Sequence, residues 1–353
     1  MTLTGCVAQG WRNLSAHKKS ILYLYLVILG SASILLLPFM ETFESSLGAG
    51  VYRERLVTAL DYDWYQLFRD RTRGAAESFG PWVLGAGPFL HTLEVLLEDG
   101  FGKLPPAVLG AVAVYLLLHT FVLSAAVSSL HLHPGGGSTR GFLRNGADFF
   151  GRFLRLSVLA LLLYWCLRQL LIPVDGWVDS YSGAAATEVT GFYLSLARYL
   201  LVLVLVLLLD LILDYARIKV VLEDRTSILL AVLAAARFCA MNFLGATGLY
   251  LLLVCFTLIW AGIYLGVDRL VDDHYWGGIL VAFVVQQIYM LGRMALKLLG
   301  FGAQIQFVKS RDPWFRDRDP LAGRPEVGTV LSPTEQAASP SPTTPSAVPG
   351  ESA

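Results

Sequence analysis

The chain has 353 residues, of which 55% are hydrophobic and only 15% are charged, and its mean hydropathy is +0.59. Soluble domains carry roughly a quarter charged residues, so this composition excludes an ordinary soluble protein. The 27 basic and 27 acidic residues balance to zero, so no nucleic-acid-binding surface is expected.

Six segments approach or exceed the roughly 20 apolar residues that cross a hydrocarbon core of about 30 Å. They predict an all-α integral membrane protein, a six-transmembrane helical bundle with spans at residues 20–40, 106–130, 154–173, 192–213, 243–266 and 276–300. The first segment has no small-residue cleavage site after its apolar run, so we expect a retained span rather than a signal peptide.

The link at residues 41–104 is too long for a plain connector. Its first part, "YRERLVTALDYDWYQLFRDRTRGAAESF", shows helical apolar spacing and predicts one or two amphipathic helices. Residues 81–99 are more apolar but are interrupted by glycines and Pro88, which predicts an interfacial helix or a segment that re-enters the membrane. Together these features predict an extracytoplasmic helical cap.

Two cytoplasmic links have amphipathic character. The stretch "HPGGGSTRGFLRNGADFFGRFLRL" predicts a glycine turn followed by a helix at the headgroups, and it lacks the Gly-Lys-Ser/Thr of a P-loop. The stretch at residues 214–238 predicts an elbow with a solvated corner at Glu223, Asp224 and Arg225, followed by an interfacial helix. Beyond the membrane domain at residues 1–316, the Pro/Ser/Thr-rich segment 317–353 predicts a disordered cytoplasmic tail.

The distribution of Lys and Arg predicts that both termini are cytoplasmic. The segment before the first span carries only basic charges, and the links 131–155 and 214–242 are also rich in Arg. The alternate links 174–191 and 267–275 contain one base between them, Arg269. We therefore expect a multi-pass protein of the cell (inner) membrane with its N- and C-termini in the cytoplasm.

Ionisable residues within spans mark candidate sites because charge is costly in a bilayer. Asp210 and Asp214 share a helix face at i, i+4, with Arg217 at i+7, and Arg293 and Lys297 share a face of the last span. Both groups fall toward the cytoplasmic end, where they could meet as an ion-pair cluster. The cluster is interpreted either as a structural staple between helices or as a relay, pathway or lipid-headgroup site.

Three further polar residues lie in the middle of spans, His119 in the second and Gln286 and Gln287 in the last. Such residues usually make interhelical hydrogen bonds, although they can also line a substrate path. No pattern of catalytic, cofactor-binding or metal-ligating residues stands out in the sequence, so we expect no cofactor.

Residues 190–310 carry the segments "DYARIKVVLEDRTS", "AVLAAARF" and "QQIYMLGRMALKL". In these patterns the chain resembles an uncharacterised family of bacterial polytopic membrane proteins, and distantly the membrane domain beside bacterial glycerophosphodiester phosphodiesterases. The resemblance implies a helical fold and an envelope location, and it transfers no activity, because the catalytic barrel of those enzymes has no counterpart here.

These observations favour a non-catalytic membrane protein that acts through association with membrane lipids or other membrane proteins, and not with nucleic acid. One alternative is a small transporter or permease subunit, with His119 and the Asp210 and Arg293 region lining its path. A second alternative is an intramembrane enzyme. Paired broken helices in an inverted repeat would favour transport, whereas an acidic or histidine cluster open to water would favour an enzyme.

Overall fold

The computed structural model describes residues 2–47, 62–72, 106–133, 136–184, 188–271, 276–312 and 315. All regular secondary structure in these residues is helical. The chain divides into two units, residues 1–310 and residues 311–353, and the helices below form the first of them. The predicted tail at 317–353 and the segment 81–99 lie outside the described residues.

The chain begins with a helix, α1 (Leu3–Ala16), that was not predicted. The Thr2 hydroxyl accepts a hydrogen bond from the Gly5 amide at 3.3 Å, which caps the first turn. The buried face of α1 includes Gly10, and a Cβ there would lie 2.8 Å from the backbone nitrogen of Ala303. This glycine therefore allows α1 to cross the last helix at backbone distance.

The first predicted span is helix α2 (Lys18–Leu47), which bends by 46° between Ile34 and Phe39. After it, α4 (Tyr62–Arg71) supplies one of the amphipathic helices expected in the long link. Its apolar face, with Trp64 only 1% exposed, packs with Leu47 and Phe43 at the end of α2. Trp64 thus belongs to a small hydrophobic core.

The next three helices are α6 (Pro106–Leu132), α7 (Thr139–Ala184) and α8 (Glu188–Leu222). Helix α6 agrees with the predicted span, and the helices that contain the spans predicted at 154–173 and 192–213 extend beyond both ends of each. Helix α7 has 46 residues and joins the expected headgroup helix to the span without a break, and it continues through Pro173.

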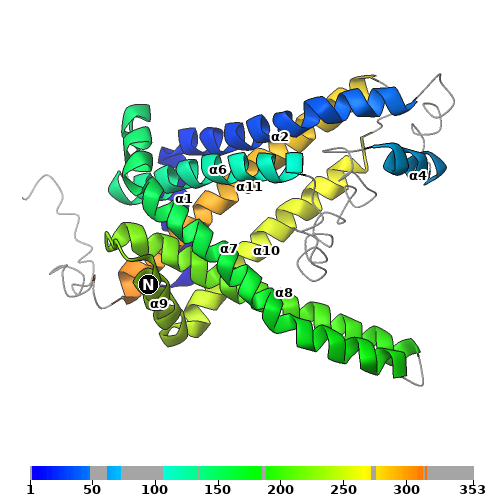
Figure 1. Cartoon of the computed structure of the whole chain (residues 1–353). Coiled ribbons are helices and arrows are strands. Elements are labelled where there is room, and N and C mark those ends of the chain that lie inside the picture. Colours follow the sequence, from blue (N-terminus) through cyan, green and yellow to red (C-terminus); the bar gives the residue numbers. More distant parts are fainter. Residues whose placement is uncertain are drawn as a thin grey trace, which may run out of the picture. The chain divides into compact units, whose positions relative to one another are not determined.

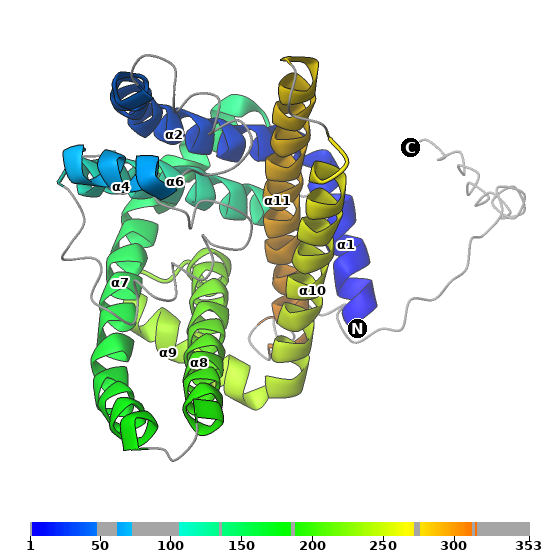
Figure 2. The same cartoon turned by 90° about the vertical axis from the view of Figure 1, so that its right-hand side faces the viewer.

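Helices α7 and α8 both extend into the expected outer link, and they run side by side in both views (Figures 1 and 2). An ion-pair group joins them there, since Arg198 of α8 lies 3.6 Å from both Asp175 and Asp179 of α7. The two acids are thus in a helix although the sequence pattern alone assigns them to a loop.

The C-terminal half of the unit contains α9 (Ile228–Met241), α10 (Phe243–Asp268) and α11 (Trp276–Arg311). Helices α10 and α11 lie side by side (Figure 2), joined by a hydrogen bond of 3.1 Å from the Trp260 indole to the Tyr289 carbonyl. Helix α11 continues beyond residue 300, where the predicted span ends, and most of its last turns are buried.

Five helices are long and apolar enough to cross a membrane, namely α6, α7, α8, α10 and α11, and the bent helix α2 makes a sixth if its two parts count as one span. Many large apolar side chains on these helices are exposed, whereas soluble monomers rarely present large contiguous apolar patches. This is the pattern of an all-α integral membrane protein.

Candidate functional site

A central cavity within the first unit has a volume of about 750 Å³ and lies among five helices, α2, α6, α8, α10 and α11. Most of its wall is apolar, with Leu253, Val254 and Met290 among the lining residues. The remainder of the wall is a polar cluster that α6, α8, α10 and α11 supply. The cavity therefore combines an apolar wall with charged groups.

Helix α8 supplies two acids and one base to this wall. Asp210, Asp214 and Arg217 recur at helical spacing and so face the same side. Asp214 accepts a hydrogen bond from the Arg217 guanidinium of its own helix. Asp210 accepts a hydrogen bond of 3.0 Å from the Tyr250 hydroxyl of α10. Each carboxylate thus has its own partner.

Helix α11 supplies two bases one turn apart, Arg293 and Lys297. The Lys297 ammonium donates to Nε2 of His119 in α6 over 3.2 Å, and the His119 ring stacks on Tyr115 at a centroid distance of 5.2 Å. The Arg293 guanidinium lies 5.9 Å from the centre of the Tyr289 ring. Both bases remain accessible from the cavity.

The structure brings Asp210, Asp214, Arg217, Arg293, Lys297 and His119 to one cavity. Among the described residues, however, no ion pair joins the acids of α8 to the bases of α11. The charged groups of α8 and α11 therefore line the same cavity without forming an ion pair between the two helices.

The two mid-span glutamines lie apart from this cluster. Gln287 accepts a hydrogen bond of 2.7 Å from the Tyr25 hydroxyl of α2, which is the interhelical role expected of such a residue. Gln286 is exposed and does not line the cavity.

The formal charges of the cavity wall do not cancel. Three bases, Arg217, Arg293 and Lys297, stand against two acids, Asp210 and Asp214. In a surrounding of low dielectric constant an excess positive charge attracts an anion more strongly than it would in water. The arrangement therefore suits a molecule with one anionic end and one apolar end.

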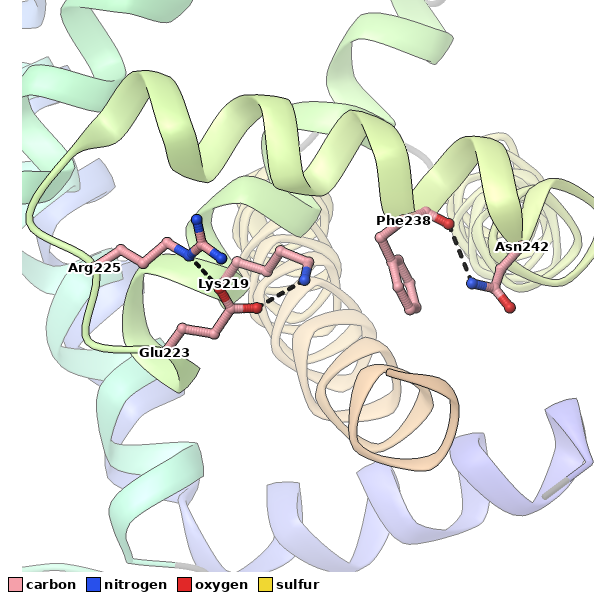
Figure 3. Close-up of polar contacts among 5 residues, drawn as sticks. All are labelled: Lys219, Glu223, Arg225, Phe238 and Asn242. Carbon is pink, nitrogen blue, oxygen red and sulfur yellow. Dashed lines mark hydrogen bonds and ion pairs between the residues drawn. The ribbon is translucent and has the colours of Figure 1, made fainter. Parts of the chain in front are cut away.

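A second polar cluster lies at the elbow between α8 and α9. Figure 3 shows that the Glu223 carboxylate accepts hydrogen bonds from Lys219, at 2.7 Å, and from Arg225. The Lys219 and Glu223 side chains are only 5% and 4% exposed, and the Lys219 ammonium lies 5.4 Å from the centre of the Phe238 ring. The predicted solvated corner is wrong for Glu223, because α9 folds back over it.

The roles of three residues at these sites could not be predicted from the sequence. Tyr250 has the pattern of an ordinary apolar position in a span, yet it is the partner of Asp210. Lys219 and Glu223 have the i, i+4 spacing of a surface pair, yet they are buried. Comparison of the chain with protein-family models, characterised proteins and solved structures found no match in any of the three.

Proposed function

We propose that the protein is a non-catalytic membrane protein whose central cavity binds a lipid or similar amphiphile with an anionic headgroup. The observation that carries the proposal is the surplus of bases over acids on a mostly apolar cavity wall. A cavity of this kind places hydrocarbon against Leu253 and Val254 and the anionic end near Arg293 and Lys297. The resemblance to membrane domains of the bacterial envelope is compatible with this role, but the proposal does not depend on it.

The contacts of the ionisable groups are those of a binding wall. Asp214 is held by Arg217, Asp210 by Tyr250, and Nε2 of His119 accepts from Lys297. These contacts fix the positions of the polar side chains around the cavity, which supports a role in binding.

We further propose six spans with both termini in the cytoplasm of a bacterial cell. The contacts that support this join helix ends expected on one side, such as Tyr23 of α2 to Thr139 of α7 at 2.9 Å. Labelling of single cysteines with an impermeant reagent in intact cells tests the topology. Labelling from outside at position 140 or 225 would refute it.

The lipid proposal is tested by purifying the full-length protein in mild detergent and identifying the retained lipids by mass spectrometry. Lys297→Met removes one of the two accessible bases, and we expect it to lower the retained anionic lipid about tenfold, because a hydrogen bond to a charged group contributes about 1.5–3 kcal/mol. Arg237→Gln removes an exposed base of α9 that does not line the cavity. Equal loss of lipid in both variants, or loss in neither, would refute the proposal.

Transport is the second candidate, and the accessibility of Arg293 and Lys297 from the cavity is the observation that favours it. A transporter moves its ligand across the bilayer, whereas a lipid-binding protein only holds it. Flux of an anionic amphiphile into proteoliposomes that is abolished by Lys297→Met would select transport over static binding.

A further inference from the structure

A second cavity, of about 330 Å³, lies where α1 meets α2 and where α7 begins. It shares no lining residue with the central cavity. Its volume is about ten times the roughly 30 Å³ that one water molecule occupies in the liquid. A small polyatomic group with several waters therefore has room in it.

The first turn of α7 forms one wall of this junction cavity. The Ser138 hydroxyl accepts a hydrogen bond from the Gly141 amide at 3.1 Å, so it caps that one N–H group. The preceding amides, of Thr139 and Arg140, are among the first four of the helix, which have no partner within it. The N-terminus of a helix also carries a partial positive charge, which favours anions.

A buried histidine supplies a second, independent sign of a ligand. His17 lines the cavity and is only 5% exposed. Its Nδ1 lies 2.9 Å from the Asn13 carbonyl oxygen, and because a carbonyl only accepts, Nδ1 carries the hydrogen of that bond. Its Nε2 is buried with no hydrogen-bond partner in the described part of the chain, although buried polar atoms normally have one.

Two serines add hydroxyl groups to the same wall. Ser20 and Ser129 line the cavity and are each 3% exposed. Neither side chain forms a hydrogen bond with another described residue. Each hydroxyl can therefore donate to an oxygen-rich ligand without giving up an internal bond.

The charges at the junction cavity are all of one sign. Lys18 and Lys19 line it and are exposed, and among the lining residues there is no Asp or Glu. An anion that entered would meet two ammonium groups and a helix N-terminus without a competing carboxylate. The cavity thus selects for negative charge.

The backbone around the cavity is held in place by specific contacts. Gly136 has φ +93°, and a Cβ there would lie 2.8 Å from the Ala16 carbonyl oxygen, so only glycine fits. The Tyr23 hydroxyl bonds the Thr139 hydroxyl at 2.9 Å, which ties α2 to the first turn of α7. These contacts hold the cavity walls against one another.

We propose that the junction cavity is a binding site for a phosphate group. A phosphate has several acceptor oxygens for the two ammonium groups, the serine hydroxyls and the first amides of α7. A protonated oxygen of a phosphate monoester can in addition donate to Nε2 of His17. The phosphate belongs either to a lipid headgroup at the membrane surface or to a soluble compound.

The test titrates the purified full-length protein, in neutral detergent, in two arms and measures the dissociation constant. The lipid arm compares dioleoyl phosphatidic acid with dioleoyl phosphatidylcholine, and the soluble arm compares inorganic phosphate with chloride at equal ionic strength. Binding in the lipid arm alone assigns the phosphate to a headgroup, and binding of inorganic phosphate shows that a free phosphate suffices. Saturable binding in neither arm would overturn the proposal.

Variants connect the binding to this cavity. Lys18→Gln combined with Lys19→Gln should raise the dissociation constant about tenfold, given that hydrogen bonds to charged groups are the strong ones. The matched control combines Arg12→Gln with Arg155→Gln, which removes the same charge from exposed positions outside the cavity. If the control loses as much affinity as the lysine variant, binding is only general electrostatic attraction and the site is refuted.

Ser129→Ala provides a second variant that preserves the fold, because the hydroxyl it removes makes no hydrogen bond within the described protein. We expect about a fivefold rise in the dissociation constant for the same phosphate ligand and no loss of thermal stability in its absence. Unchanged affinity in this variant, together with unchanged affinity in the lysine variant, would exclude the cavity as the site.

Discussion

Replacement of Glu223 by Gln tests the buried cluster at the elbow. The change keeps the shape of the side chain and one acceptor oxygen but removes the charge that neutralises Lys219 and Arg225. The Lys219 and Glu223 side chains are 5% and 4% exposed, so water cannot replace the lost interaction. Removing one partner of a buried pair typically costs about 3–5 kcal/mol, and we expect about 3 kcal/mol here.

A double-mutant cycle separates this coupling from general damage. Lys219→Met should cost less, about 2 kcal/mol, because Glu223 keeps its bond to Arg225. The double variant leaves no buried charge at either position and should also cost about 2 kcal/mol, which implies a coupling of about 3 kcal/mol. The measurement is unfolding by SDS titration in mixed micelles, followed by circular dichroism.

The control is a second ion pair at the same elbow, between Arg152 and Asp224, whose side chains are 24% and 75% exposed. Arg152→Gln and Asp224→Asn should each change stability by less than about 1 kcal/mol, as for other surface pairs. Asp224 has φ +49°, a conformation that Asn also tolerates. Additive losses for Lys219 and Glu223, equal in size to those of the control, would refute the burial of the pair.

Three further outcomes are expected. Gly10→Val should lower the midpoint of thermal unfolding and detach α1, since a Cβ would meet the Ala303 backbone at 2.8 Å, whereas Gly110→Ala should not, because nothing lies within 4 Å of its Cβ. Burial raises the pKa of the Cys239 thiol to about 12, against the charge of Lys219, so thiol alkylation at pH 8 should be much slower in the folded protein than in SDS. Since that pKa is raised on folding, the protein should lose stability as the pH rises above about 8.5, where the unfolded chain loses the thiol proton and the folded protein keeps it. Cys239→Ala should reduce this loss, and the same pH dependence of stability in the variant and in the unmodified protein would contradict the burial of the thiol.

Much of the helical architecture follows from local pattern. Apolar runs long enough to cross a bilayer predict α6 and α10 nearly to the residue, because the bilayer sets the length and backbone hydrogen bonding requires a helix. Helix ends outside the apolar runs do not follow from this pattern. Asp175 and Asp179 lie in a helix, beside Arg198 of the next one, where charge and glycine content alone indicate a loop.

The candidate site divides in the same way. The i, i+4 spacing of Asp210 and Asp214, and of Arg293 and Lys297, determines from sequence alone that each pair shares one helix face. Only the packing of the helices decides that both faces meet at one cavity, and that Tyr250 binds Asp210. Spacing along one helix is a local property of its backbone, whereas distances between helices depend on every side chain at their contacts.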